Sequence, residues 1–404
     1  MSTSARTRIV VTGLGGLCSI GGNVPAIWSA MRAGTVGIGP IAVPGLEDKV
    51  RIGGQIGELP EHGFDRRKLA AADRFALMAA IAAGEALAQA GLVDSGISAN
   101  RIGAIVGTGV FGITTMEESF QGLLLNSKRP GVFSVPKIMP SAPAAQVSML
   151  HGLKGPVFGV TSACASSNHA FSAAADQIRL GRADVMLAGG ADAILTNGHI
   201  RGWESLRALA REMCRPFSAD RDGLVLGEGA GILVLESEQH AKARGATILA
   251  EFAGAGMSGD AGDIVAPTIE GPIAAMQACL ADAGLQPGDV DYINAHGTAT
   301  KFNDAMETAA IRRVFGAHAD SLSVSATKSM HAHCLGASGA IEALACILAL
   351  REGVIAPTAN YREPDPECDL DVTPNVARRR SVRAAISNAF AFGGTNAVAA
   401  FKAA

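Results

Sequence analysis

Segments from the first part of this chain recur, in the same order, in its second part. Residues 86–92 read Ala-Leu-Ala-Gln-Ala-Gly-Leu and precede a strand predicted at 102–106, while residues 279–285 read Cys-Leu-Ala-Asp-Ala-Gly-Leu and precede a strand predicted at 290–295. Two further pairs of segments occur in the same order in both parts of the chain: a pair of Ala-rich helices, and a pair of glycine turns that precede strands. Three matches in order indicate an internal duplication.

The duplication divides the chain into halves at residues 1–250 and 251–404. Each half alternates predicted strands and helices, so we expect each to be an α/β unit with mostly parallel strands. Two such halves can stack their sheets around shared buried helices, and 49 glycines with only 4% aromatic residues favour close packing through small side chains. The strand ends of both halves would then converge on one site.

Composition argues against several classes of protein. The net charge of −3 lacks the basic excess that is typical of nucleic-acid binders. Seven scattered cysteines, none in a CxxC pair, suggest neither a disulfide framework nor a zinc site and favour a reducing compartment. The first residues show no signal-peptide core, and no apolar run approaches membrane-spanning length. We expect a cytoplasmic protein that binds no nucleic acid and spans no membrane.

A glycine-rich segment follows the first predicted strand, at 9–13. Gly13-Leu14-Gly15-Gly16 superficially resembles a dinucleotide-binding loop, but the G-x-G-x-x-G spacing requires a glycine where Cys18 stands. We therefore predict a turn between a strand and a loop. Farther along, the polar residues 65–68 lead into a helix predicted at 70–90.

Cys164 stands at the junction of a strand predicted at 156–160 and an Ala-rich helix predicted at 165–182. Free backbone N–H groups and the positive end of a helix dipole favour an anion there, so they would lower the pKa of the thiol. These features are typical of a nucleophile. A small cysteine that fills a gap in the core is the alternative, and residues elsewhere in the chain have to decide between the two.

The second half supplies polar groups at predicted strand ends. His296 lies in an open loop of glycine and threonine, although a lone histidine is more often structural. Lys328 precedes His331 and His333, which are spaced like a metal-binding pair, but no Asp, Glu or Cys at matching spacing completes a zinc site. Residues 388–396 form a glycine-rich turn that can aim a backbone N–H at an oxyanion.

Four motifs together resemble those of elongating, type II β-ketoacyl-[acyl-carrier-protein] synthases of the thiolase-like superfamily. They are Thr161-Ser162-Ala163-Cys164, Asn294-Ala295-His296-Gly297-Thr298, Thr327-Lys328-Ser329 with His333, and Phe392-Gly393-Gly394-Thr395-Asn396. The motifs occur in the order and at the spacing of the family, and the resemblance covers essentially the whole chain. The resemblance implies a thiolase-like five-layer αβαβα fold from two duplicated halves. Within the family, residues 330–334 and 360–370 look most similar to the nodulation branch, which builds special acyl chains for lipo-oligosaccharide signals.

The resemblance also implies a reaction. Cys164 would take an acyl group from acyl-carrier protein as a thioester, and malonyl-carrier protein would then lose CO₂ and attack it. His296 and His333 would donate hydrogen bonds to the enolate, and the N–H groups of Cys164 and Phe392 would hold the later oxyanion. Lys328 would orient the histidines. The enzyme would act as a homodimer without a metal or a cofactor of its own, since phosphopantetheine arrives on the carrier protein.

The resemblance implies roles for further residues as well. The expected supporting residues around the histidines and the lysine are Glu342, Asp304 and Glu307. The residues expected to hydrogen-bond the phosphopantetheine arm are Thr298 and Thr300. The acyl pocket would be lined by Val110, Ser134, Trp203 and Phe392. The basic residues expected where the acidic carrier protein docks are Arg66, Arg67, Lys68, Arg74, Lys128, Arg129 and Arg207.

Two positions depart from the common pattern of the family. Ala391 replaces a glycine, which would restrict a gating loop at Phe392 because alanine disfavours positive φ. Val265 stands where many members have a threonine, so one contact to the pantetheine would be missing. Neither position touches the reacting groups.

Other functions compete with condensation. A non-catalytic chain-length factor would lack the nucleophile, yet Cys164, His296 and His333 are all present. A thiolase would use two cysteines, and a starter-type condensing enzyme would replace one histidine by asparagine. Among the synthases themselves, housekeeping fatty-acid elongation is the alternative to a specialised acyl substrate.

Overall fold

The computed structural model describes residues 6–49, 51–93, 95–264 and 268–404, apart from the Arg66 side chain. Its main sheet has ten strands in the order β10-β9-β13-β14-β8-β1-β7-β6-β4-β5. The strands of the first half are β1 (Ile9–Cys18), β4 (Ile102–Gly107), β5 (Val157–Val160), β6 (Val185–Asp192) and β7 (Gly229–Ser237). Those of the second half are β8 (Ala250–Gly259), β9 (Tyr292–Asn294), β10 (Ser323–Ser325), β13 (Ala384–Ala391) and β14 (Thr395–Lys402).

The strand order repeats between the halves. Counted outward from the centre of the sheet, the strands of each half follow the order first, fifth, fourth, second, third. A short antiparallel pairing between β1 and β8, in which Ile9 lies opposite Phe252, joins the two sets of five strands into one sheet. This shared order supports the duplication that the repeated segments predict.

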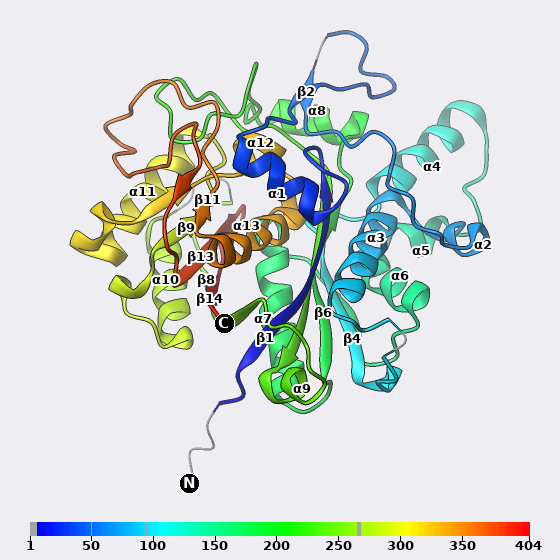
Figure 1. Ribbon diagram of the computed structural model, residues 1–404. Helices are drawn as coiled ribbons and strands as arrows, with labels where there is room; N and C mark the ends of the chain where they lie inside the picture. The colour runs from blue at the N-terminus through cyan, green and yellow to red at the C-terminus, as the bar shows by residue number, and fades with distance from the viewer. Residues whose placement is uncertain (1–5, 50, 94, 265–267) are drawn as a thin grey trace.

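Helices form three layers around the two sets of strands (Figure 1). α7 (Ser166–Arg179) and α13 (Ser338–Glu352) lie in the middle and contact strands of both halves. α3 (Arg74–Gln89) and α6 (Ala142–His151) cover the outer face of the first half, and α10 (Glu270–Ala283) covers that of the second. The predicted five-layer αβαβα fold is confirmed.

The expectation of mostly parallel strands is wrong. β4 pairs in parallel with β5 and β6, and β9 pairs in parallel with β10 and β13. The remaining pairs of neighbouring strands are antiparallel. In the second half the reversal comes from a tight hairpin between β13 and β14, where Gly393 and Gly394 adopt φ of 79° and 66°. Left-handed backbone of this kind costs a glycine little.

The glycines at 13–16 form no turn, because β1 continues through them to Cys18. A Cβ at Gly13 would lie 2.2 Å from the Ala86 carbonyl oxygen, and one at Gly15 would lie 1.9 Å from that of Ala82. The glycines therefore let α3 pack directly on the strand. The helix predicted at 70–90 begins later than expected, since α3 starts after the Asp73 cap, and the residues that lead into it form a separate short helix, α2 (Arg66–Leu69).

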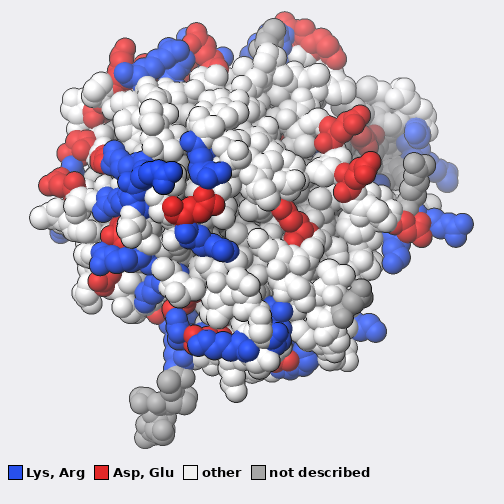
Figure 2. All heavy atoms as spheres, viewed as in Figure 1, with Lys and Arg blue, Asp and Glu red and all other residues white. Residues whose placement is uncertain are grey.

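The other elements are shorter or lie at the surface. The remaining helices are α1 (Val24–Ala33), α4 (Ile113–Asn126), α5 (Ser134–Ile138), α8 (Asn197–Ser205), α9 (Glu238–Ala243), α11 (Lys301–Phe315) and α12 (Lys328–His331). The short strands are β2 (Gly39–Pro40), β3 (Ile52–Gly53), β11 (Val354–Ile355) and β12 (Arg378–Arg379). Acidic and basic side chains are intermixed on the face shown in Figure 2. Among the described residues, no helix has the length and apolar character that a membrane crossing requires.

Candidate active site

Cys164 lies where the sequence places it, between β5 and α7. A 3₁₀ turn, Ala163–Ala165, joins the two elements, and Ala163 has a φ of 47° that non-glycine residues rarely adopt. The Ser166 hydroxyl holds this turn, since its Oγ lies 2.7 Å from the Ala163 carbonyl oxygen and accepts the Ser162 N–H at 2.9 Å. The strained turn thus presents the thiol at the start of the central helix.

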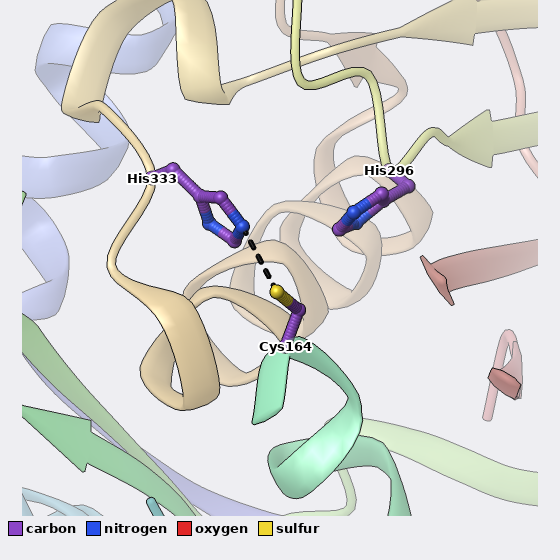
Figure 3. Close-up of side chains that lie close together, drawn as sticks. All are labelled: Cys164, His296 and His333. Atoms are coloured by element: carbon purple, nitrogen blue, oxygen red, sulfur yellow. Dashed lines mark hydrogen bonds between the residues drawn. The ribbon is translucent and has the colours of Figure 1, made fainter. Parts of the chain in front are cut away.

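Two histidines from the second half face this thiol (Figure 3). His333, which follows α12, places Nε2 3.2 Å from Cys164 Sγ. His296, which follows β9, lies with its ring centroid 5.5 Å from that of His333 and nearly perpendicular to it. One donor atom from each of the three residues lies within 4.8 Å of the others, and all three side chains are buried. The structure brings together the candidate nucleophile of one half and the imidazoles of the other.

Glu307 holds the His296 loop. Its carboxylate accepts the backbone N–H groups of His296 and Gly297, each at 2.8 Å, and the Asn388 amide at 3.0 Å. Burial raises the pKa of Glu307, although these donors oppose the rise. Removal of the carboxylate would leave two backbone donors buried without a partner, so Glu307 positions the histidine through its main chain.

Asp304 supports a different segment. It accepts the Phe217 N–H at 2.8 Å, and its carboxylate lies 3.8 Å from the Arg221 guanidinium. Burial raises the pKa of Asp304 to about 6. It therefore ties α11 to the loop that precedes β7, and among the described residues its hydrogen bonds go to Phe217 and Asn303 rather than to Cys164 or the two histidines.

Lys328 and Glu342 form the predicted pair. The Lys328 ammonium donates to Glu342 Oε1, and neither side chain has exposed surface. Burial raises the pKa of Glu342, and the lysine opposes the rise. The positive charge of Lys328 also lowers the pKa of His296 and His333, after burial as the larger cause. The Lys328 charge therefore helps to keep both imidazoles neutral near pH 7.

Ser338 lets the neutral His333 use either tautomer. Its Oγ lies 2.9 Å from His333 Nδ1 and accepts the Cys334 N–H at 2.9 Å. A hydroxyl can donate to Nδ1 or accept from it. His333 Nε2 can therefore act as a donor in one step and as an acceptor in another.

The Cys164 thiol is less acidic than the helix terminus suggests. Burial raises its pKa to about 12, while Lys328 and a backbone N–H lower it less. The prediction of a lowered pKa is wrong because the second half covers the thiol and removes water from it. Reactivity would then depend on proton transfer to a neighbour, and His333 Nε2 is close enough to accept the proton.

His331 does not join His333 in a site. Its Nε2 lies 3.1 Å from the Thr327 hydroxyl, and its Nδ1 has no hydrogen-bond partner in the described part of the chain. Because His333 faces Cys164 instead, the two histidines of the HxH motif point to different surroundings. The motif is not a metal-binding pair.

A cavity of about 540 Å³ opens in front of Cys164, His296 and His333. Thr298 and Thr300 also line it, with their hydroxyls 3.0 Å apart. Its other lining residues are largely apolar, and they include Leu206, Ala208, Leu224, Ile264, Phe302 and Phe390. The cavity therefore joins the three reactive side chains to the surface through a partly apolar passage.

Trp203 and Phe392 stack at the side of this cavity, with ring centroids 5.5 Å apart and planes 26° from parallel. The Trp203 indole donates to His199 Nε2 at 2.9 Å, which fixes the orientation of the ring. Phe392 remains 42% exposed. Ala391 does not have positive φ in this conformation, so the alanine is unstrained here.

The four residues expected in the acyl pocket do not all lie around one cavity. Val110 packs in the same apolar cluster as Cys164 and Trp203. Ser134 instead lines a separate cavity of about 470 Å³ with residues of α4 and the segment that follows it. Within one chain, Ser134 is therefore not part of the cavity at Cys164.

The expected docking residues lie in different settings. Arg67 and Lys68 are exposed on α2, Lys128 and Arg129 are exposed beside Ser134, and Arg207 lies at the mouth of the Cys164 cavity. Arg74 is tied to the buried Glu228, with Nε 2.8 Å from the carboxylate, so its side chain serves the fold. The Arg66 side chain and Val265 lie outside the described residues.

The sequence analysis did not identify several supporting residues. Ser338, Asn388 and His199 each hydrogen-bond a residue of the candidate site, yet each lies on a different segment from that residue or several positions away from it. A hydroxyl five residues after His333 is the one local signal that points to Ser338.

Comparisons with known proteins agree with this geometry. Residues 6–241 match the model of the beta-ketoacyl synthase N-terminal domain, and residues 249–362 match that of the C-terminal domain. Nodulation protein E of Rhizobium sp. (strain N33) is 62% identical over 397 residues, which are 98% of this chain and 99% of that protein.

More distant relatives preserve the similarity. The 3-oxoacyl-[acyl-carrier-protein] synthase 2 of Staphylococcus aureus (strain N315) is 42% identical and covers 99% of both chains. The ketosynthase complex described as "AntDE:AntF (apo): type II PKS acyl-carrier protein in complex with its ketosynthase bound to the hexaketide" matches with a TM-score of 0.91 and 32% identity, over 99% of this chain and 100% of that one. With both domains matched and the trio assembled, the chain belongs to the β-ketoacyl synthase family.

Proposed function

We propose that this chain is a β-ketoacyl-[acyl-carrier-protein] synthase that condenses malonyl-carrier protein with an acyl group held on Cys164. One observation carries the proposal: Cys164 Sγ lies 3.2 Å from His333 Nε2, and His296 faces the same point. The 42% identity to a 3-oxoacyl synthase supports the reaction. The 62% identity to a nodulation protein E supports a specialised acyl substrate rather than housekeeping elongation.

In the first half-reaction, the acyl group moves to the enzyme. The Cys164 thiol passes its proton to His333 Nε2 as Sγ attacks the carbonyl of the acyl thioester. The bond to the pantetheine sulfur then breaks, and that sulfur leaves as a thiol with the proton from the imidazole. We assign the oxyanion of this step to the N–H groups of Cys164 and Phe392.

In the second half-reaction, malonyl-carrier protein loses CO₂. The electron pair of the broken C–C bond moves into the thioester, and the enolate oxygen accepts hydrogen bonds from neutral His296 and His333. Burial keeps both imidazoles neutral by lowering their pKa values. The enolate carbon attacks the acyl-Cys164 carbonyl, forms the new C–C bond and expels the thiolate, which takes up a proton.

The cavity suits a phosphopantetheine arm delivered by a carrier protein, so the enzyme needs no cofactor of its own. Thr298 and Thr300 line the passage and offer hydroxyls to the arm. Arg207, which lines the cavity, and the exposed Arg67 would attract an acidic carrier protein. A related ketosynthase whose structure includes its acyl-carrier protein supports this choice of partner.

A second copy of the chain would complete the acyl pocket. β5 is an edge strand of the sheet, and Phe158 on it is 39% exposed. The α4 residues Leu124 and Leu125 and the following Val132 are also 76%, 78% and 92% exposed. An open sheet edge and exposed apolar surface each favour association. A homodimer formed there would bring Ser134 of one copy toward the cavity of the other.

All seven cysteines are free, in keeping with a reducing cytoplasm.

Intact mass after mixing with acyl-carrier-protein thioester tests the assignment. The wild-type chain should gain one acyl group, and Cys164→Ala should gain none. Cys164→Gln should continue to decarboxylate malonyl-carrier protein, because its amide mimics the acylated state while the histidines remain. Cys279→Ala, which alters a buried cysteine on the outer helix α10, is the matched control and should still be acylated. Undiminished condensation by Cys164→Ala would refute the nucleophile. Absence of any adduct on the wild-type chain would instead favour a chain-length-factor role.

A further inference from the structure

Cys164, His296 and His333 have the donor types of a zinc site. One thiol sulfur and two imidazole nitrogens lie within 4.8 Å of one another, and the sulfur lies 3.2 Å from His333 Nε2. In a tetrahedral site with Zn–S near 2.3 Å and Zn–N near 2.0–2.1 Å, donor atoms lie about 3.4–3.6 Å apart. Side-chain rotations that move the His296 nitrogen or the Cys164 sulfur by about 1 Å would therefore bring the three donor atoms to the distances of a zinc site.

The surroundings leave room for the fourth ligand. The three donors face a cavity of about 540 Å³ that opens to the surface, so water can occupy the remaining position. Zinc sites with three protein ligands keep such an open position. The ion can also enter by the same passage that serves the substrate.

The residues behind the donors argue against a tightly held resident metal. His333 Nδ1 is supported by the Ser338 hydroxyl, while the buried His296 Nδ1 has no hydrogen-bond partner in the described part of the chain. Resident zinc sites commonly orient their histidines with carboxylates, which also raise ligand basicity. The buried Lys328 ammonium adds repulsion, which Glu342 offsets only in part. The binding should therefore be reversible.

We propose that a thiophilic divalent cation, with Zn²⁺ as the example, binds Cys164, His296 and His333 and blocks the nucleophile. As the Zn–S bond forms, the thiol loses its proton to solvent, and no atom changes oxidation state. An acyl group on Cys164 removes the sulfur as a ligand, so acylation and metal binding exclude each other. The inhibitory consequence rests on the proposed condensing function, whereas the binding itself does not.

Calorimetry with ZnCl₂ and absorption with CoCl₂ test the binding on the full chain without any substrate. We expect one equivalent of either metal and, with cobalt, a thiolate-to-metal charge-transfer band. Cys164→Ala should abolish that band, and His296→Ala and His333→Ala should each weaken Zn²⁺ binding about tenfold or more. His62→Asn removes a more accessible histidine outside the cavity and should leave the binding unchanged. Zn²⁺ bound equally well by Cys164→Ala would overturn the proposal, since the ion would then occupy a surface site.

A competition experiment links the site to the chemistry. Chain that has been acylated on Cys164 should bind Zn²⁺ at least about tenfold more weakly than free chain, and EDTA should restore acylation to Zn²⁺-treated enzyme. If the chain bound one Zn²⁺ through Cys164 yet was never acylated, the metal site would stand and the condensing function would fail. If acylation proceeded at the same rate with saturating Zn²⁺, the blocking role would be refuted.

Discussion

Variants of the buried pair Lys328–Glu342 measure what the pair contributes to folding stability and to the action of the two histidines. Neither side chain has exposed surface, and among the described residues the ammonium has its one hydrogen bond with Glu342. Glu342→Ala would leave that ammonium buried without a counter-charge. Loss of one partner from such a pair costs about 3–5 kcal/mol of folding free energy.

The expected shift in melting temperature follows from chain length. An unfolding entropy of about 2.1 cal/mol/K per residue gives about 0.85 kcal/mol/K for 404 residues. A loss of about 3–5 kcal/mol should therefore lower Tm by about 4–6 °C, which circular dichroism can resolve. Glu352→Ala, at the exposed end of the same helix, is the matched control and should shift Tm by less than about 1 °C, because its pair with Arg32 is exposed to solvent.

A double variant separates stability from catalysis. Lys328→Met with Glu342→Leu replaces the ion pair by apolar side chains of similar volume, so Tm should return to near the wild-type value. Decarboxylation of malonyl-carrier protein should nevertheless be slower than in the wild type, because the Lys328 charge that acts on His296 and His333 is gone. A Glu342→Ala chain that melts like the wild type, or a double variant with full decarboxylation, would refute the reasoning.

Three further outcomes follow from the site. Because burial raises the pKa of Cys164 to about 12, its alkylation by iodoacetamide should rise about tenfold per pH unit between pH 7 and 9.5, as followed by peptide mass; a plateau below pH 8 would show a stabilised thiolate instead. Charge reversal at Arg67 and Arg207 should raise KM for the carrier-protein substrate and weaken its salt dependence, and an unchanged KM would remove these residues from the docking surface. In the proposed homodimer, where Ser134 of one copy would reach the cavity of the other, Ser134→Phe should slow long or unsaturated acyl primers at least several-fold, a loss of about 1–3 kcal/mol from overpacking, while it spares short ones; equal slowing of both would exclude Ser134 as a gauge of chain length.

Local sequence features predicted much of the architecture. The repeated segments indicated two related halves, since the spacing of apolar residues and glycines survives in each copy, and the shared strand order agrees with this. The junction at Cys164 was also predicted correctly, because a strand, a turn and an Ala-rich helix each leave a local pattern. The duplication further predicted that Cys164 would face residues of the second half, as it does.

Features that depend on distant contacts were predicted less well. The pairing direction of β7, β8 and β14 is set by long-range register, so the expected parallel sheet became a mixed one. Gly13 and Gly15 look like turn residues, yet they serve the close approach of α3, which only the packed fold reveals. The placement of Ser134 outside the Cys164 cavity likewise depends on surfaces beyond its own segment.

The error in the thiol pKa points to a common cause for the chemistry of the trio. Burial raises the pKa of Cys164 and lowers those of His296 and His333, so the same loss of water keeps all three groups neutral near pH 7. A permanent thiolate beside a permanent imidazolium would suit the first half-reaction alone. Neutral imidazoles can accept the thiol proton in one step and donate to an enolate in the next. The covering of Cys164 by the second half, which a single segment cannot reveal, is therefore what allows one site to serve both half-reactions.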